Sequence, residues 1–305
     1  YPARSISALF GISYRRSRGE MAEYFSLQAA LCFATSHILI RRGLVTSNAV
    51  TGSFITLGMT ALIFWLLLPF FNPLSDLWTP AAWYFLAAGV FAPGLGRTLT
   101  YVGIERVGIA RSVPISNCSP LFASFLAVFL LEELWTPQNF LGTTFVILGI
   151  AILSRARPGP SEWRRLDLIY PVVAALAFAI SSNLRKLGLI ASNLPLMAAA
   201  FTAATGFVFA LCLLHVRGGW RVLRLSRANY GWFFTAGIAN TAATLSVFHA
   251  LSFGKVVVVE PLVAVNPVIS LILSAIFLKD LETITPRVVL GALCTVVGTT
   301  LVLTR

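Results

Sequence analysis

The sequence predicts an all-α, polytopic membrane protein with ten transmembrane helices, arranged as two inverted five-helix repeats. Three observations lead to this fold class. The composition is strongly apolar: 57% of residues are hydrophobic, 11% are charged and the mean hydropathy is +0.84, whereas soluble domains carry roughly a quarter charged residues. The few charged residues cluster between long apolar stretches, and the two halves of the chain resemble each other.

Ten stretches without a charged side chain account for the predicted helices. A hydrocarbon core of about 30 Å needs roughly 17 to 25 apolar residues, and in lipid only a helix satisfies its own backbone. A large soluble helical bundle would instead need a polar stripe along each helix, which segments such as "TALIFWLLLPFF" lack. The ten stretches are 24–40, 43–75, 77–96, 112–131, 134–154, 168–184, 187–216, 228–254, 261–278 and 288–304.

The repeat is visible when the chain is compared with itself. The segment "AALCFATSHILIRRGL" from Ala29 resembles "AALAFAISSNLRKLGL" from Ala174 at an offset of 145, and Pro120 falls on Pro267 at an offset of 147. Each half holds five predicted spans, so the second copy must enter the membrane from the opposite side. Inverted repeats of this kind are a recurring construction of secondary transporters, which alternate between two states around a midplane site.

The repeat divides the chain into four predicted parts. Residues 23–154 form the first repeat and 167–305 the second, with a basic linker over 155–166. Residues 1–22 are interpreted as an N-terminal extension, with Met21 as a candidate start of the protein. Its basic cluster follows a short apolar run, the reverse of the order in a signal peptide.

The ends of the two repeats carry a family resemblance. The segment "ERVGIARSVPISNCSPLFASFLAVFLLEEL" and its counterpart "FGKVVVVEPLVAVNPVISLILSAIFLKDL" each combine an apolar helix with prolines and an acidic end, followed by a short turn and a glycine-containing last helix. This pattern resembles the EamA repeat of the drug/metabolite transporter (DMT) superfamily. The resemblance implies ten helices, a two-repeat fold, and export or exchange of amino acids, other metabolites or drugs.

The predicted function is therefore secondary transport of a small metabolite, such as an amino acid or a drug, by alternating access in the cell (inner) membrane. Transport is expected to be energised by an ion gradient or by exchange, because the chain has no "GxxxxGK[ST]" nucleotide loop to power a pump; the resemblance implies an exporter or exchanger. Two alternatives are an intramembrane enzyme and a non-transporting receptor or scaffold. Catalysis is not expected, since the sequence has neither "HExxH" nor "GxSxG".

Polar residues inside the predicted spans are the candidate site, because a charge deep in lipid is costly unless it has a partner or a function. Glu260 lies in "KVVVVEPLVAVNP", about one and a half turns inside the ninth predicted helix. Its carboxyl could exchange a proton for substrate, which makes it a candidate ion-coupling residue. The equally weighted alternative is an interfacial Glu260 paired with Lys255 or a neighbouring arginine.

Arg97 lies in "FAPGLGRTLTYVGIER", where Pro93, Gly94 and Gly96 are expected to loosen or break the third helix. A guanidinium can hold a carboxylate or phosphate bidentately, so Arg97 is a candidate substrate-binding residue. The alternative is that it neutralises Glu105, two turns along the same face.

Other intramembrane residues complete the candidate site. Asn117, Asn240 and Asn266 can bind substrate through their amides or tie two helices together. Because free histidine is the side chain that changes charge near neutral pH, His37 and His249 are candidate ion-coupling residues; the alternative for each is a hydrogen-bonded packing residue. Arg41, Arg42, Arg185 and Lys186 end the first helix of each repeat, where snorkelling explains them.

Cofactors, metals and nucleic acid are not expected as partners. The four cysteines lack the paired spacing of a zinc or redox site. The net charge of +12 comes mostly from short inter-helix loops, where Lys and Arg anchor a membrane protein. The expected partners are the lipid bilayer, a small-molecule substrate and a coupling proton.

Overall fold

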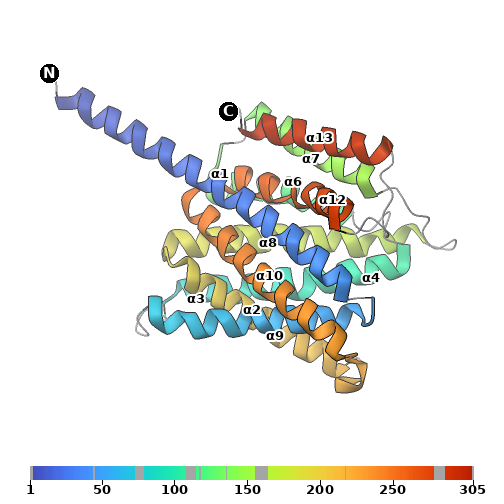
Figure 1. Ribbon diagram of the computed structural model, residues 1–305. Helices are drawn as coiled ribbons and strands as arrows, with labels where there is room; N and C mark the ends of the chain where they lie inside the picture. The colour runs from blue at the N-terminus through green and yellow to red at the C-terminus, as the bar shows by residue number, and fades with distance from the viewer. Residues whose placement is uncertain are drawn as a thin grey trace.

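The computed structural model describes residues 3–43, 45–72, 79–107, 115–116, 118–134, 136–154, 164–216, 218–277 and 286–303. Over these residues the chain is helical and contains no strand (Figure 1), which confirms the all-α prediction. The first half contains α1 (Ala3–Gly43), α2 (Ala49–Phe71), α3 (Ala81–Gly89), η2 (Val90–Gly96), α4 (Arg97–Val107), α6 (Ser119–Leu131) and α7 (Pro137–Ser154). The second half contains η3 (Arg165–Leu168), α8 (Ile169–Ala191), α9 (Pro195–Val216), η4 (Gly219–Val222), α10 (Arg227–Phe253), α11 (Val256–Val263), α12 (Asn266–Phe277) and α13 (Pro286–Leu303).

Three helices in the described part of the chain are long and apolar enough to cross a membrane, judged by length and composition alone. They cover Val50–Phe71, Leu166–Ala191 and Pro195–Val216. Large apolar side chains on their outer faces are exposed, among them Phe70 at 84% and Val216 at 82%. Such exposure suits contact with lipid, since an apolar surface of this kind is unfavourable in water.

The two halves pack against each other in a reciprocal pattern (Figure 1). Helix α1 of the first half packs on α10 of the second. Their counterparts in the opposite halves, α8 and α3, pack on each other as well. In the same way α1 packs on α12 and α8 on α6, while α2 packs on α10 and α9 on α3. The pairs α2 with α9 and α7 with α13 each join one helix to its own counterpart. Such self-complementary pairing is expected when two copies of one unit meet across a two-fold axis.

Two equivalent serines illustrate this relationship at atomic level. Ser36 on α1 donates a hydrogen bond to the carbonyl of Ala236 on α10 at 2.9 Å. Ser181 on α8, 145 residues later, donates to the carbonyl of Ala88 on α3 at 2.8 Å. Both serines are buried, and small hydroxyl-bearing residues let helix backbones approach closely in membrane proteins.

The third helical segment was expected to loosen or break around Pro93, and the structure contains a widened helix. The chain runs without interruption from α3 through the π-helical turns of η2 into α4. Pro93 lies inside η2 and lacks the backbone N–H that an α-helix needs there. A π-helical stretch accommodates this loss and is frequently found at functional sites.

The ninth segment is interrupted at its middle. Helix α11 ends at Val263, two turn residues follow, and α12 begins at Asn266. The interruption lies between Pro261 and Pro267, neither of which can donate a backbone hydrogen bond. Interrupted helices at membrane depth are tolerated where they line a cavity.

A cluster of buried apolar side chains among the described residues occupies one end of the bundle. It combines the N-terminal part of α3 and α9 and nearly all of α11 with the C-terminal part of α2, α6, α8 and α10. Ala22 and Ala29 of α1 also belong to it. Representative members are Ala22, Ala29, Phe64, Leu68, Phe85, Leu189, Met197, Phe248, Leu251 and Val256. The helices are therefore in tight contact at this end, whereas the cavity described next lies further along them.

Candidate functional site

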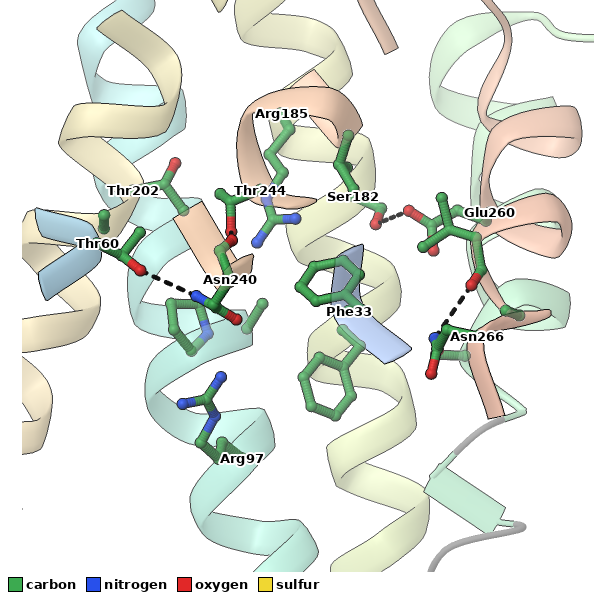
Figure 2. Close-up of a pocket in the computed structure, with 18 of the residues that line it drawn as sticks. Phe33, Thr60, Arg97, Ser182, Arg185, Thr202, Asn240, Thr244, Glu260 and Asn266 are labelled. Atoms are coloured by element: carbon green, nitrogen blue, oxygen red, sulfur yellow. Dashed lines mark hydrogen bonds between the residues drawn. The ribbon is translucent and has the colours of Figure 1, made fainter. Parts of the chain in front are cut away.

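A cavity of about 360 Å³ lies between the two halves of the chain. This volume suits a small metabolite, since small-molecule sites occupy roughly 300 to 1,000 Å³. Helices α1, α2, α4, α6, α8, α9, α10, α11 and α12 all contribute to its wall, together with η2. Figure 2 shows that its polar wall includes Thr60, Arg97, Ser182, Arg185, Thr202, Asn240, Thr244, Glu260 and Asn266.

Glu260 lies on the second turn of α11 and faces the cavity. The hydroxyl of Ser182 on α8 donates a hydrogen bond to its carboxylate (Figure 2). Lys255 is exposed at the start of α11, and the described contacts of Glu260 include no ion pair with it. The carboxylate is therefore held across the interface between α8 and α11.

Arg185 also points into the cavity; in Figure 2 its side chain lies between Thr244 and Ser182. The interpretation of Arg185 as a snorkelling residue at a helix end is wrong, because α8 continues to Ala191 and turns this side chain inward. Its guanidinium carbon lies 5.3 Å from the ring centroid of Phe248, a cation–π contact. Its Nε is buried and has no hydrogen-bond partner among the described residues.

Arg97 is the first residue of α4, immediately after the π-helical turns, and its side chain extends into the cavity (Figure 2). His37 on α1 lines the same cavity and is close enough to interact electrostatically with Arg97. Arg97 makes no hydrogen bond or ion pair with any residue whose contacts the structure describes. The side chain of Glu105, the alternative partner, lies outside the described part.

Two of the three candidate asparagines line the cavity. Asn240 Nδ2 on α10 donates to Thr60 Oγ1 on α2 at 3.0 Å. Asn266 Nδ2 donates to the carbonyl of Val263 at 3.0 Å, which satisfies an oxygen freed by the interruption between α11 and α12. Both asparagines therefore have a structural bond as well as a position on the wall. Asn117 lies outside the described residues.

His249 is placed apart from the other candidates. It is not among the residues that line the cavity. Its Nδ1 lies 3.0 Å from the carbonyl of Leu245 on the same helix, and its ring centroid is 5.2 Å from that of Phe25. His249 therefore packs in an aromatic group with Phe25 and Phe253. A packing role is the alternative to ion coupling that the sequence left open.

Equivalent positions of the two repeats meet on the cavity wall. At the offset of 145, Phe33 matches Phe178 and His37 matches Ser182, and all four line the cavity. At the offset of 147, Ser119 matches Asn266, and both line it. The cavity therefore follows the two-fold relation between the repeats.

The charges do not follow this symmetry. Arg185 matches Ile40 in the first repeat, and Glu260 matches Val113. The frame of the cavity is thus duplicated, while its acidic group and one of its two arginines come from the second repeat alone. This difference distinguishes the two ends of the site chemically.

Sequence reasoning missed Ser182, Arg185, Thr60 and Thr244 as wall residues. The repeat itself held a signal for one of them, because Ser182 is the equivalent of the candidate His37. No comparable pattern points to Thr60 or Thr244. Their place on the wall depends on how α2 and α10 are rotated about their axes.

Comparison with known proteins agrees with this architecture. The family model described as "EamA-like transporter family" matches residues 21–155 and again 166–304. One solved protein, described as "Crystal structure of protein", has a TM-score of 0.77 at 16% identity, over 92% of this chain and 95% of that chain, which shows a shared fold. No curated protein matches the sequence.

Two related helical repeats around a polar cavity, with lipid-compatible outer faces, define an integral membrane protein of the transporter class. The chain belongs to the EamA-like transporter family. The resemblance inferred from the repeat ends is thereby confirmed, and with it the expectation of a small-molecule substrate and a lipid environment.

Proposed function

We propose that this protein is a secondary carrier that moves a small polar metabolite, such as an amino acid or a drug, across the cell (inner) membrane by alternating access. The observation that carries the proposal is the polar cavity between the two repeats, lined by equivalent positions of both. A carrier built from inverted repeats binds its substrate at such an interface and opens to the two sides in turn.

The proposal includes ten spans and an inverted second repeat. It is supported by reading α3, η2 and α4 as one span and α11 with α12 as another. With five spans in each repeat, the second copy enters the membrane from the opposite side. The reciprocal pairing of helices between the halves agrees with this topology.

Dense apolar packing at one end of the bundle supports alternation. The apolar cluster closes the bundle at the end formed by the start of α3 and α9 and the end of α8 and α10. In a protein with two-fold related repeats, the symmetry-related elements at the other end can form the same contacts. A carrier needs two such arrangements, each closed at one end, which ligands or ions then select.

Within this cycle we assign roles to the wall residues. Arg97, free of described hydrogen-bond partners, binds an anionic group of the substrate. Asn240 and Asn266 border the substrate, and Asn117 is proposed as a further contact from its sequence position. Glu260 and His37, which both line the cavity, couple transport to a proton; His249 is left out because it does not line the cavity.

Purified protein in liposomes tests the proposal directly. Saturable uptake of a radiolabelled solute that depends on an imposed proton gradient or on internal exchange substrate is the expected result. Candidate solutes come from a growth screen under excess amino acids, nucleosides and drugs, with and without the gene. Turnover of a lipid or peptide without any flux would contradict carrier function and favour an intramembrane enzyme.

A further inference from the structure

The connection between α10 and α11 is held at both of its helix ends by charged side chains from other helices. Helix α10 ends at Phe253, and α11 begins at Val256. Helix ends leave backbone groups without intrahelical partners, partly positive N–H groups at the start and partly negative carbonyls at the end. At this connection both kinds of group are satisfied from outside.

Glu133 binds the start of α11. Its Oε1 accepts a hydrogen bond from the backbone N–H of Val256 at 2.9 Å, and its Oε2 accepts one from Val257 at 3.1 Å. Glu133 is only 6% exposed and comes from the connection between α6 and α7 in the first repeat. It belongs to the acidic "EEL" end of that repeat, so the motif has a structural partner in the other repeat.

Lys186 binds the end of α10. Its Nζ donates to the carbonyl of Leu251 at 2.7 Å and to that of Gly254 at 2.6 Å. Lys186 lies on α8, directly after the cavity residue Arg185. A cation thus caps the partly negative end of α10 while an anion caps the partly positive start of α11, which is the favourable arrangement for both helix dipoles.

This connection lies one helical turn beyond the cavity wall on both of its helices. Glu260 follows Val256 by one turn, roughly 6 Å along the helix, and Val247 on the cavity wall precedes Leu251 by one turn. The valines at positions 256 to 259 are at most 1% exposed. Gly254 lies directly against α1, where an added Cβ would sit 2.5 Å from that of Ala22.

We propose that Glu133 and Lys186 form a two-point latch that holds the α10–α11 connection closed, and that this latch releases when the carrier opens its cavity at this end. The inference rests on the proposed alternating access. Alternating access requires the α10–α11 connection to move in every transport cycle. If apolar packing alone held it closed, this movement would be slow. Glu133 and Lys186 instead hold backbone groups through hydrogen bonds, which water can replace when the α10–α11 connection moves away.

Accessibility of a buried reporter cysteine tests the latch without any substrate. The four native cysteines, Cys32, Cys118, Cys212 and Cys294, are first replaced by alanine. Val259→Cys then introduces one thiol on α11 at a position that is 0% exposed, and a water-soluble maleimide labels it in proteoliposomes. In the closed state this thiol is expected to react slowly.

Glu133→Gln and Lys186→Gln remove the two caps separately, and Glu132→Gln is the matched control. Glu132 is adjacent and exposed, so its substitution makes the same change of charge without touching α11. We expect about tenfold faster labelling with either cap removed, because losing a charge-assisted bond shifts a two-state equilibrium by about that factor. The control is expected to label at the parent rate.

Two results would overturn the latch: unchanged labelling in both cap variants, or an equal increase in Glu132→Gln, which would indicate general loosening. Only preparations that remain monodisperse in size-exclusion chromatography are compared, and the two caps lie on different helices, so one misfolded variant leaves the other as a test. Faster labelling in a protein that transports nothing would sink the carrier proposal and leave the latch. Transport without any change in labelling would overturn the latch and support the carrier proposal.

Discussion

Ser182 on α8 donates a hydrogen bond to the carboxylate of Glu260 on α11, and this bond joins the first and fourth spans proposed for the second repeat at the cavity wall. The carboxylate is therefore held where a substrate or a proton entering the cavity would meet it. Arg185 lines the same cavity, so a change in the charge of Glu260 alters the electrostatic interaction of Glu260 with this arginine. The predicted coupling of transport to a proton follows from the Glu260 carboxylate.

Glu260→Gln is expected to abolish accumulation driven by a proton gradient, with a loss of at least about tenfold in the driven rate. The amide keeps the size of the side chain and can still accept from Ser182, but it cannot carry a proton in exchange for substrate. Uptake in proteoliposomes with an imposed pH gradient measures this. Exchange of substrate across the membrane without a gradient should persist.

The matched control for this variant is Glu132→Gln, since Glu132 is exposed and is not among the residues that line the cavity. Driven uptake in Glu260→Gln equal to that of the control would remove Glu260 from the coupling role. Loss of both driven uptake and exchange would place the carboxylate in substrate binding.

Arg97→Ala is expected to raise KM for an anionic or zwitterionic substrate by about 10- to 100-fold, which corresponds to roughly 1.5 to 3 kcal/mol for a lost charge-assisted hydrogen bond. Expression should stay near normal, because Arg97 has no described hydrogen bond to lose. Arg97→Lys should recover part of the affinity, since it restores the charge and not the bidentate geometry. Initial rates against substrate concentration measure all three proteins.

Arg221→Ala, in the exposed η4 turn, is the control for a loss of positive charge outside the cavity. A KM for Arg97→Ala indistinguishable from this control would contradict the assignment of Arg97 to substrate binding.

Asn240→Ala and Thr60→Val separate two roles of the amide. Both variants remove the 3.0 Å hydrogen bond between α10 and α2, and Thr60→Val also removes the bonds that the Thr60 hydroxyl makes with Thr241 and with the carbonyl of Thr56. Each lost bond is worth about 1 kcal/mol, so the melting temperature should fall in both variants and further in Thr60→Val. If Asn240 also contacts substrate, only Asn240→Ala should raise KM further. Equal KM values in the two variants would show that Asn240 serves as a tie between helices.

Gly298→Ala is expected to destabilise the pair of helices α7 and α13. An added Cβ would lie 2.5 Å from the carbonyl oxygen of Gly142 and 2.6 Å from the backbone nitrogen of Val146. Because both neighbours are backbone atoms, the helices must separate, at a cost of about 1 to 3 kcal/mol. Thermal unfolding in detergent, followed by circular dichroism, measures the effect.

Gly231→Ala on α10 is the matched control, since nothing lies within 4 Å of the position of its Cβ. Alanine has the higher helix propensity, so this variant should be unchanged or slightly more stable. A stable Gly298→Ala protein would mean that α7 and α13 do not need their close contact.

Much of the fold could be predicted because it depends on properties that run along the chain. Long charge-free stretches, the offset between Ala29 and Ala174, and the proline-containing helix ends are all legible in the printed sequence. They indicated a helical, duplicated membrane protein of the EamA type, and the family match agrees. The interruption after α11 was not predicted, although Pro261 and Pro267 flank it.

The candidate site was less accessible to the same reasoning. Arg97, Asn240, Asn266, Glu260 and His37 were selected as polar residues within spans, and all five line one cavity. His249 met the same criterion and lies elsewhere. Arg185 was set aside because a basic residue near the end of a charge-free stretch usually reaches toward the interface, yet α8 continues past it.

By itself the sequence determined which segments are apolar, that they come in two copies, and which polar groups lie at membrane depth. Only the tertiary structure decided which of those groups face one another, and that Glu133 of one repeat caps α11 of the other. The reason is geometric. Hydrophobicity and spacing are properties of a single helix, whereas the direction in which a side chain points depends on how that helix is rotated and packed against its neighbours.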